Sequence, residues 1–156
     1  MTRHASFAAR PLILCVIAIA TLGVGMRVHS APPKGDPTLP TAEWKAIKKV
    51  IADQRAALKT GDAAKAFAQA SPGIRAQFES PEKFLAMVRT AYDALLAARY
   101  VEFLEGAVIE GNVIQPLRLI APDNSVQVAL YTMEKQKDGR WKISGCVLAP
   151  STVQAV

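Results

Sequence analysis

The sequence predicts an α+β fold in which three N-terminal helices pack on a four-stranded antiparallel meander. Two observations support this prediction. Apolar residues recur at helical spacing up to about residue 95, and from Tyr100 onward they alternate with a period of two. Short turn signals separate the alternating segments, and a meander needs helices over one face because its apolar side would otherwise lie in water. A chain of 156 residues, 51% hydrophobic and 21% charged, has globular composition, so we expect one domain.

A secretory leader is predicted at the N-terminus. The uncharged run 12–26 follows a basic start that includes Arg3 and Arg10, and small residues follow the run. Cleavage after Ser30 would leave Ala31 as the first residue of an exported, periplasmic or secreted chain. The alternative is an uncleaved anchor, although this run is short against the roughly 20 residues that span a bilayer. The predicted organisation is a signal peptide over 1–30, a Pro-rich spacer over 31–40, an α+β domain over 41–150 and a tail over 151–156.

The first helix is predicted over about 42–59. Thr41 is a favourable N-cap, and Gly61 supplies a C-terminal stop after a repeat of apolar residues at helical spacing. A short second helix follows Asp62 and is broken by Ser71-Pro72-Gly73.

The third helix opens at Ser80, with Pro81 at its first position, and reaches Leu95. The predicted strands are 100–109, 113–121, 126–135 and 140–148. Pro116 lacks an N–H to donate, which predicts an edge position or a bulge in the second strand. In the first strand one alternating set is Val101, Phe103, Ala107 and Ile109, and in the last strand it is Trp141, Ile143, Gly145 and Val147.

The predicted mature chain excludes several classes of function. Both histidines and Cys15 lie within residues 1–30, so Cys146 is the single remaining thiol. His-based catalysis, a His-ligated metal and an intramolecular disulfide therefore have no residues to use. No cofactor is expected, because the glycine motifs that hold phosphates are missing. Without the leader, Lys+Arg falls from 19 to 16 against 13 acids, and a net charge of +3 does not predict nucleic-acid binding.

The densest basic stretch lies in the first helix and just beyond it. Its members are Lys45, Lys48, Lys49, Arg55, Lys59 and Lys65. We interpret the stretch as a solvated helix face, with contact to an anionic membrane surface as the minority alternative.

Three sequence blocks carry a family resemblance. ASPGI at 70–74, ALYTME at 129–134 and DGRWKISGCVL at 138–148 resemble the bacterial family known as domain of unknown function 4864, over about 45–149. The order of helices and strands also looks like the nuclear-transport-factor-2-like (SnoaL-like) cone fold, in which a curved sheet wraps around a long first helix. The resemblance implies a small exported bacterial protein and carries over no catalytic residue.

Cone-fold relatives often hold a small apolar ligand between sheet and helices, and often dimerise through the sheet. By this analogy the leading interpretation is a non-catalytic module that binds a small apolar ligand or presents its sheet to a partner, including a second copy. The alternative is a cofactor-free isomerase or hydrolase that uses a cavity carboxylate and a tyrosine. Met133 is expected mainly in the core, and a buried Cys146 would act as a small hydrophobe. The candidate pocket residues are Tyr92, Tyr100, Tyr131, Met133, Glu134 and Cys146.

Overall fold

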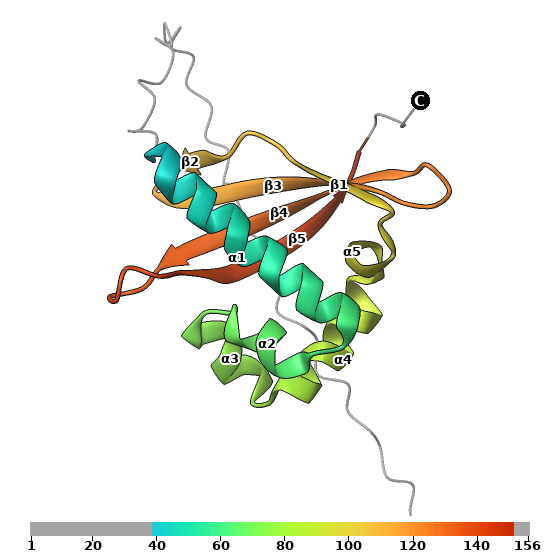
Figure 1. The fold of residues 1–156 in the computed structure, drawn as a ribbon, viewed down its shortest axis with the longest axis horizontal. Helices are drawn as coiled ribbons and strands as arrows, with labels where there is room; N and C mark the ends of the chain where they lie inside the picture. Colours follow the sequence, from blue (N-terminus) through green and yellow to red (C-terminus); the bar gives the residue numbers. More distant parts are fainter. Residues whose placement is uncertain (1–38, 152–156) are drawn as a thin grey trace, which may run out of the picture. The chain divides into compact units, whose positions relative to one another are not determined.

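The computed structural model describes residues 39–151, which belong to one compact unit. All helices precede the strands along this part of the chain (Figure 1). The helices are α1 (Thr41–Thr60), α2 (Ala63–Ala68), α3 (Pro72–Phe78), α4 (Pro81–Ala91) and α5 (Asp93–Ala97). The strands are β1 (Tyr100–Phe103), β2 (Ala107–Ile109), β3 (Asn112–Ile120), β4 (Val126–Lys135) and β5 (Trp141–Pro150).

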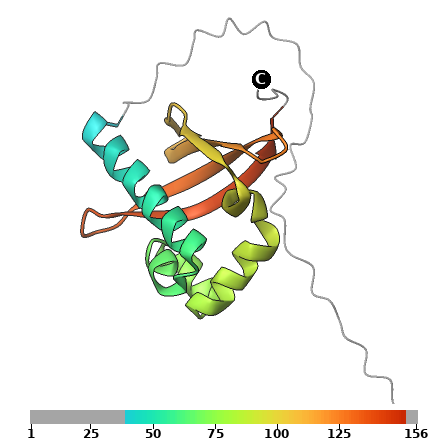
Figure 2. The same cartoon turned by 45° about the vertical axis from the view of Figure 1, so that its right-hand side comes forward.

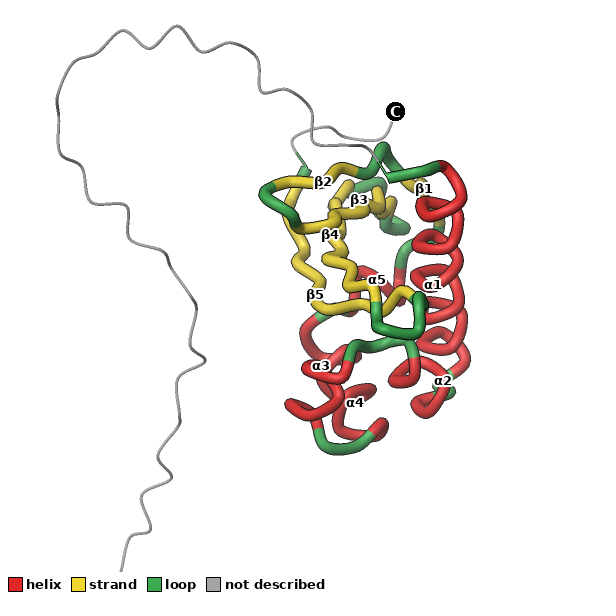
Figure 3. The backbone as a smooth tube through the Cα atoms, turned by 90° about the vertical axis from the view of Figure 1, so that its left-hand side faces the viewer, coloured by secondary structure: helices red, strands yellow, loops and turns green. Residues whose placement is uncertain are grey.

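The strands form one antiparallel sheet in the order β1-β3-β4-β5, and β2 also pairs with β3. Helix α1 crosses one face of the sheet, while α2, α3 and α4 gather at one end (Figure 2). From the side, α1 stands on one side of the strands (Figure 3). The α+β class and the antiparallel pairing are confirmed. The predicted numbers of three helices and four strands are wrong, since the described residues form five of each.

The first helix ends as predicted but begins differently. Pro40 occupies the N-cap without a side-chain hydrogen bond, so the predicted cap at Thr41 is wrong. Gly61 has a φ of 74°, and this left-handed backbone satisfies carbonyls of the last turn of α1. Asp62 then caps α2, because its carboxylate accepts the Lys65 N–H at 3.0 Å.

Helix α2 ends at Ala68, and the segment Ser71-Pro72-Gly73 that follows starts α3, a helix that the sequence pattern missed. Ser71 caps α3 through its hydroxyl, and Pro72 takes the first helical position. The next helix opens at the predicted cap, Ser80. It divides at Tyr92, whose φ of −130° and ψ of 37° are not helical, so α4 and α5 replace one predicted helix.

The predicted strand 100–109 is interrupted. Its β1 part pairs with β3 up to Phe103, its β2 part resumes at Ala107, and between them three residues face two of β3. One extra residue reverses the alternation of side chains. Val108 therefore packs on the core. Ala107 and Ile109 are exposed, although the sequence pattern predicted them on the same face as Val101 and Phe103.

Pro116 lies opposite this interruption. It pairs with Leu130 of β4 on one side, so it is inside the sheet and the predicted edge position is wrong. On the other side its carbonyl accepts the Leu104 N–H at 3.1 Å, within the gap between β1 and β2. The extra residue lies in the predicted first strand, facing the side on which Pro116 has no N–H, so the irregularity is opposite the second strand and not within it as predicted.

A second irregularity lies in β5. Ser144 has no partner in the ladder, because the register with β4 shifts by one residue there. Beyond it Cys146 packs on the core, while Val147 is 62% exposed. The alternation predicted from Trp141 therefore holds only as far as Ile143.

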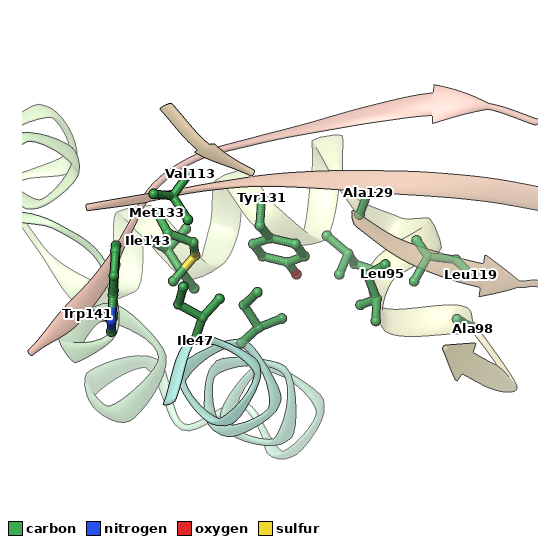
Figure 4. Packing of buried hydrophobic residues seen from close by; sticks show 12 residues of the cluster. Ile47, Leu95, Ala98, Val113, Leu119, Ala129, Tyr131, Met133, Trp141 and Ile143 are labelled. Atoms are coloured by element: carbon green, nitrogen blue, oxygen red, sulfur yellow. The ribbon is translucent and has the colours of Figure 1, made fainter. Parts of the chain in front are cut away.

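The larger hydrophobic core fills the space between α1 and the inner face of the sheet. Figure 4 shows Ile47 of α1 facing strand residues that include Tyr131, Met133 and Trp141. The predicted core positions of Met133 and Trp141 are confirmed. Among the described residues the buried members are Ile47, Ile51, Leu95, Ala98, Val113, Leu117, Leu119, Ala129, Tyr131, Met133, Trp141 and Ile143.

A smaller core joins the C-terminal half of α1 to α2, α3 and α4. The ring of Phe84 lies 5.5 Å from that of Phe67 and 5.6 Å from that of Phe78, centroid to centroid. Leu58 of α1 is buried in the same cluster. Because α1 contributes residues to both cores, it connects helices α2, α3 and α4 to the sheet.

Glu43 connects the start of α1 to the hairpin formed by β4 and β5. Its carboxylate accepts hydrogen bonds from Lys135 Nζ at 2.7 Å and from Trp141 Nε1 at 2.5 Å. The bond from Lys135, followed by that from Trp141, lowers the pKa of Glu43 below its ordinary value of 4.5. The folded state therefore favours the charged carboxylate, so its stabilising effect is complete above pH 4.5 and is lost as the pH falls through the folded pKa.

Glu43→Gln should reduce the free energy of unfolding at pH 7, and the difference from wild type should shrink as the pH falls below 4.5. Urea unfolding at a series of pH values measures this difference. Glu105→Gln, at an exposed position between β1 and β2, serves as the control. A Glu43→Gln difference that stays constant into the acid range would contradict the assigned role.

Candidate functional site

The sheet brings two predicted pocket residues together at the centre of its inner face. Tyr131 of β4 stands opposite Cys146 of β5, and Tyr131 is only 1% exposed. Tyr92, between α4 and α5, reaches the same strand and donates its hydroxyl hydrogen to the Cys146 carbonyl at 2.8 Å. These three residues, with Arg55, form what we call the inner cluster.

Arg55 enters the inner cluster from α1. It is half-buried, and one terminal nitrogen donates to the Leu95 carbonyl at 3.3 Å. Its buried Nε has no hydrogen-bond partner among the described residues, and the buried hydroxyl of Tyr131 has the neighbouring Cys146 thiol as its one side-chain partner there. The two groups also interact electrostatically. The cluster therefore holds a cation with an unused buried donor next to a buried phenol.

Burial dominates the protonation of the inner cluster. It raises the pKa of Cys146 from 9.0 to about 12, against a smaller opposing effect of Tyr131. It also raises the pKa of Tyr131 well above 10.0, assisted by the Cys146 thiol and opposed by Arg55. Burial also raises the pKa of Tyr92 and lowers the pKa of Arg55. All three acidic groups are therefore protonated at neutral pH.

The remaining predicted pocket residues do not join the inner cluster. Met133 lies in the same core, 4% exposed. Tyr100 is 54% exposed, and Glu134 is exposed on the opposite side of β4 from Met133. Sequence reasoning missed Arg55, which it placed on a solvated face. The available signal was spacing, since Arg55 follows Ile51 by four residues on the buried stripe of α1.

The outer face of the sheet is apolar and carries no helix in the described part of the chain (Figure 3). All four large hydrophobic side chains that are exposed among residues 39–151 belong to it by strand alternation. They are Tyr100 of β1, Ile109 of β2, Leu130 of β4 and Val147 of β5. Leu130 stands between Pro116 and Val147 in the register, so this apolar surface is continuous across three strands.

The charged residues near the middle of the outer face neutralise each other. Arg118 of β3 donates to Glu102 of β1 at 2.8 Å, and the two residues are paired in the ladder. Both side chains are less than half exposed. The outer face thus presents exposed apolar side chains from four strands, and the charges near its middle are already paired.

A separate groove of about 370 Å³ lies between α1 and α2, away from both surfaces described above. Its acidic residues already hold cations, since Asp53 pairs with Lys49 and Asp62 with Lys65. Within the described residues no group of His, Cys, Asp or Glu side chains is arranged to hold a metal ion. None of the helices that the structure describes is long and apolar enough to cross a membrane.

Fold and surfaces together define a small α+β protein with a helix-covered inner sheet face and an open apolar outer face. The chain belongs to the family described as a domain of unknown function, DUF4864, whose model matches residues 40–156. No curated protein and no solved structure shows significant similarity to it.

Proposed function

We propose that the chain is an exported, non-catalytic interaction module that associates through the outer face of its sheet with a second copy of itself. The observation that carries this proposal is that Tyr100, Ile109, Leu130 and Val147 all lie exposed on that face, with Leu130 and Val147 side by side next to Pro116. Monomeric proteins rarely leave a large contiguous apolar patch in water. Covering such a patch contributes about 25 cal/mol per Å² of apolar surface.

A second copy is the partner that the charges of this face fit best. The proposed mature chain is basic, with 16 Lys+Arg against 13 acids, yet Arg118 and Glu102 neutralise each other on the outer face. Two identical faces can therefore meet over Pro116, Leu130 and Val147 without burying an unpaired charge there, while the exposed Glu134 lies further along β4. Two sheets also pack well face to face, with their side chains interleaved.

Export and membership of the cone-fold superfamily are part of the same proposal. The basic start, apolar run and small residues before Ala31 support cleavage and transfer to the periplasm or beyond. The helix α1 lying across an antiparallel sheet supports the nuclear-transport-factor-2-like arrangement.

The enzymatic alternative has less support from the inner cluster. The groups that shift the pKa values of Tyr92, Tyr131 and Cys146 are each other and Arg55, with no carboxylate among them. Glu134, the predicted acid, is exposed on the other side of β4. An isomerase-type site needs a carboxylate facing its hydrogen-bond donor.

Val147→Lys should convert the mature protein from dimer to monomer, because it places a charge at the most exposed apolar position of the outer face. Sedimentation equilibrium measures the mass of the particle. The circular dichroism spectrum should stay unchanged, since Val147 is 62% exposed and contributes little to the core.

The matched control is Ala91→Lys, which adds the same charge at an exposed position ending α4. This variant should remain a dimer. If wild type is already a monomer at concentrations where both variants are also monomers, the second copy is not the partner. If Val147→Lys remains a dimer, association does not use the outer face.

A further inference from the structure

We propose that the ion pair Glu102–Arg118 determines which partners the outer face accepts, restricting association to a face without an unbalanced charge, as on a second copy. This role rests on the proposed association through that face and deepens it. Three features support the role: the strand register around the pair, the mutual dependence of its two charges, and the cost of burying one charge alone.

The strand register places the ion pair between two mainly apolar rows that cross the outer face. Successive outward-facing residues of a strand lie about 7 Å apart, so each row is one such step along β3 from Arg118. A stable interface buries about 800 Å² on each partner, which is much wider than the two steps between the rows. A partner that covers both rows therefore also covers the pair. The rows are Pro116, Leu130 and Val147 on one side of the pair, and Ile120 and Tyr100 on the other.

The two charges of the pair depend on each other. Arg118 Nη1 donates to Glu102 Oε2 at 2.8 Å, and neither side chain forms another ion pair within residues 39–151. Their row continues with Val128 of β4 and Ala149 of β5, whose side chains cannot form hydrogen bonds. In the single chain the two side chains are 44% and 43% exposed, so water still solvates both. Once the face is covered, each charge has only the other to replace that water.

Burial of the face therefore favours balanced charges. An ion pair that is buried with both members present is tolerated, whereas removing one member leaves a buried charge without compensation and is strongly unfavourable. A second copy brings another balanced pair. A partner that places an unpaired charge against this region would bury that charge among apolar rows, and the face rejects it.

Single substitutions should unbalance the face and weaken dimer formation. Glu102→Gln leaves the charge of Arg118 unpaired, and Arg118→Gln leaves that of Glu102 unpaired. Each variant should raise the dissociation constant of the dimer by at least about tenfold, because association would bury the remaining charge. The double variant carries neither charge and should recover most of the lost affinity. Sedimentation equilibrium of the mature proteins measures each dissociation constant.

A mixture of the two single variants tests charge balance most sharply. The positive face of Glu102→Gln complements the negative face of Arg118→Gln, so the two variants should form a mixed dimer more tightly than either forms with itself. One variant is labelled with nitrogen-15, and native mass spectrometry then separates the mixed dimer from the two symmetric ones by mass.

Glu79→Gln is the matched control, because it breaks the exposed ion pair with Lys83 among the helices and should leave the dimer unchanged. Circular dichroism and unfolding temperature establish that each variant is folded. A monomeric wild type would overturn the proposed association, and the role of the ion pair with it. If wild type is a dimer, the role alone is overturned when the single variants dimerise like wild type, when the double variant is as weak as they are, or when the mixed dimer is not preferred.

Discussion

The native thiol of Cys146 should react with a disulfide reagent at pH 8 at least about thirtyfold more slowly than the same thiol in the unfolded chain, because the higher nucleophilicity of a more basic thiolate offsets only part of its lower abundance. Burial raises its pKa from 9.0 to about 12, and three pKa units correspond to about a thousandfold less thiolate. Only the thiolate attacks the reagent. Labelling rates of the native protein and of the protein in denaturant measure the ratio directly.

A cysteine at an exposed position provides the matched control. Ala91→Cys in a Cys146→Ala background places the thiol at the exposed end of α4, where it should react nearly as fast as in the unfolded chain. If native Cys146 reacts within about tenfold of the unfolded chain, the thiol is accessible and the description of the inner cluster is wrong.

The same raised pKa predicts how stability changes in alkaline solution. The folded pKa of Cys146 is higher than its ordinary value, so the folded state disfavours the thiolate. The stability associated with the protonated thiol is fully present below pH 9.0 and is lost as the pH rises toward 12. Cys146→Ala should therefore lose less stability than wild type across this range.

Gly106→Ala should lower the free energy of unfolding by about 2–3 kcal/mol, the cost of forcing extra atoms into a packed contact. Gly106 lies in the segment between β1 and β2, where Trp44 of α1 packs against it. A Cβ at this position would overlap the Trp44 ring, with two ring carbons at 2.7 Å. The ring must then move away from the core that it partly covers. Urea unfolding measures the change.

Two variants separate this clash from a general effect of replacing glycine. Gly73→Ala, in α3, meets no atom closer than 3.9 Å and should leave stability unchanged or slightly higher, because alanine favours the helix. In a Trp44→Leu background, Gly106→Ala should cost much less than in wild type, since the clashing ring is gone. Equal costs in both backgrounds would show that Trp44 is not the cause.

The sequence predicts best where local chemistry decides the structure. The Gly61 stop, the Asp62 and Ser80 caps and the bounds of β4 need only residues close in the chain, and all are confirmed. Ser71-Pro72-Gly73 shows the limit of such signals. The same residues that break one helix can cap the next, and only packing of the following turn selects α3.

Strand faces could be predicted only up to each irregularity in the sheet. The interruption opposite Pro116 and the extra residue Ser144 each reverse the alternation beyond them. Because of these reversals, Ile109 and Val147 lie on the outer face and Cys146 on the inner one. Such shifts depend on pairing with a neighbouring strand, which a period of two in one segment does not contain.

The members of the inner cluster could be predicted only in part, because their assembly depends on contacts between segments that are distant in the sequence. Tyr92, Tyr131 and Cys146 were candidates from the sequence, and the pairing of β4 with β5 and the bend at Tyr92 bring them together. Arg55 was not a candidate, because its charge suggested a solvated face. Its position four residues after Ile51 places it beside the core.

The most direct test of the central claim is the native mass of the protein recovered from the periplasm of an expressing bacterium. The account predicts a particle of two chains, each beginning at Ala31, which Val147→Lys converts to single chains that begin at the same residue. A single mature chain in the wild-type sample, at concentrations well above the micromolar range, would contradict association through the outer face.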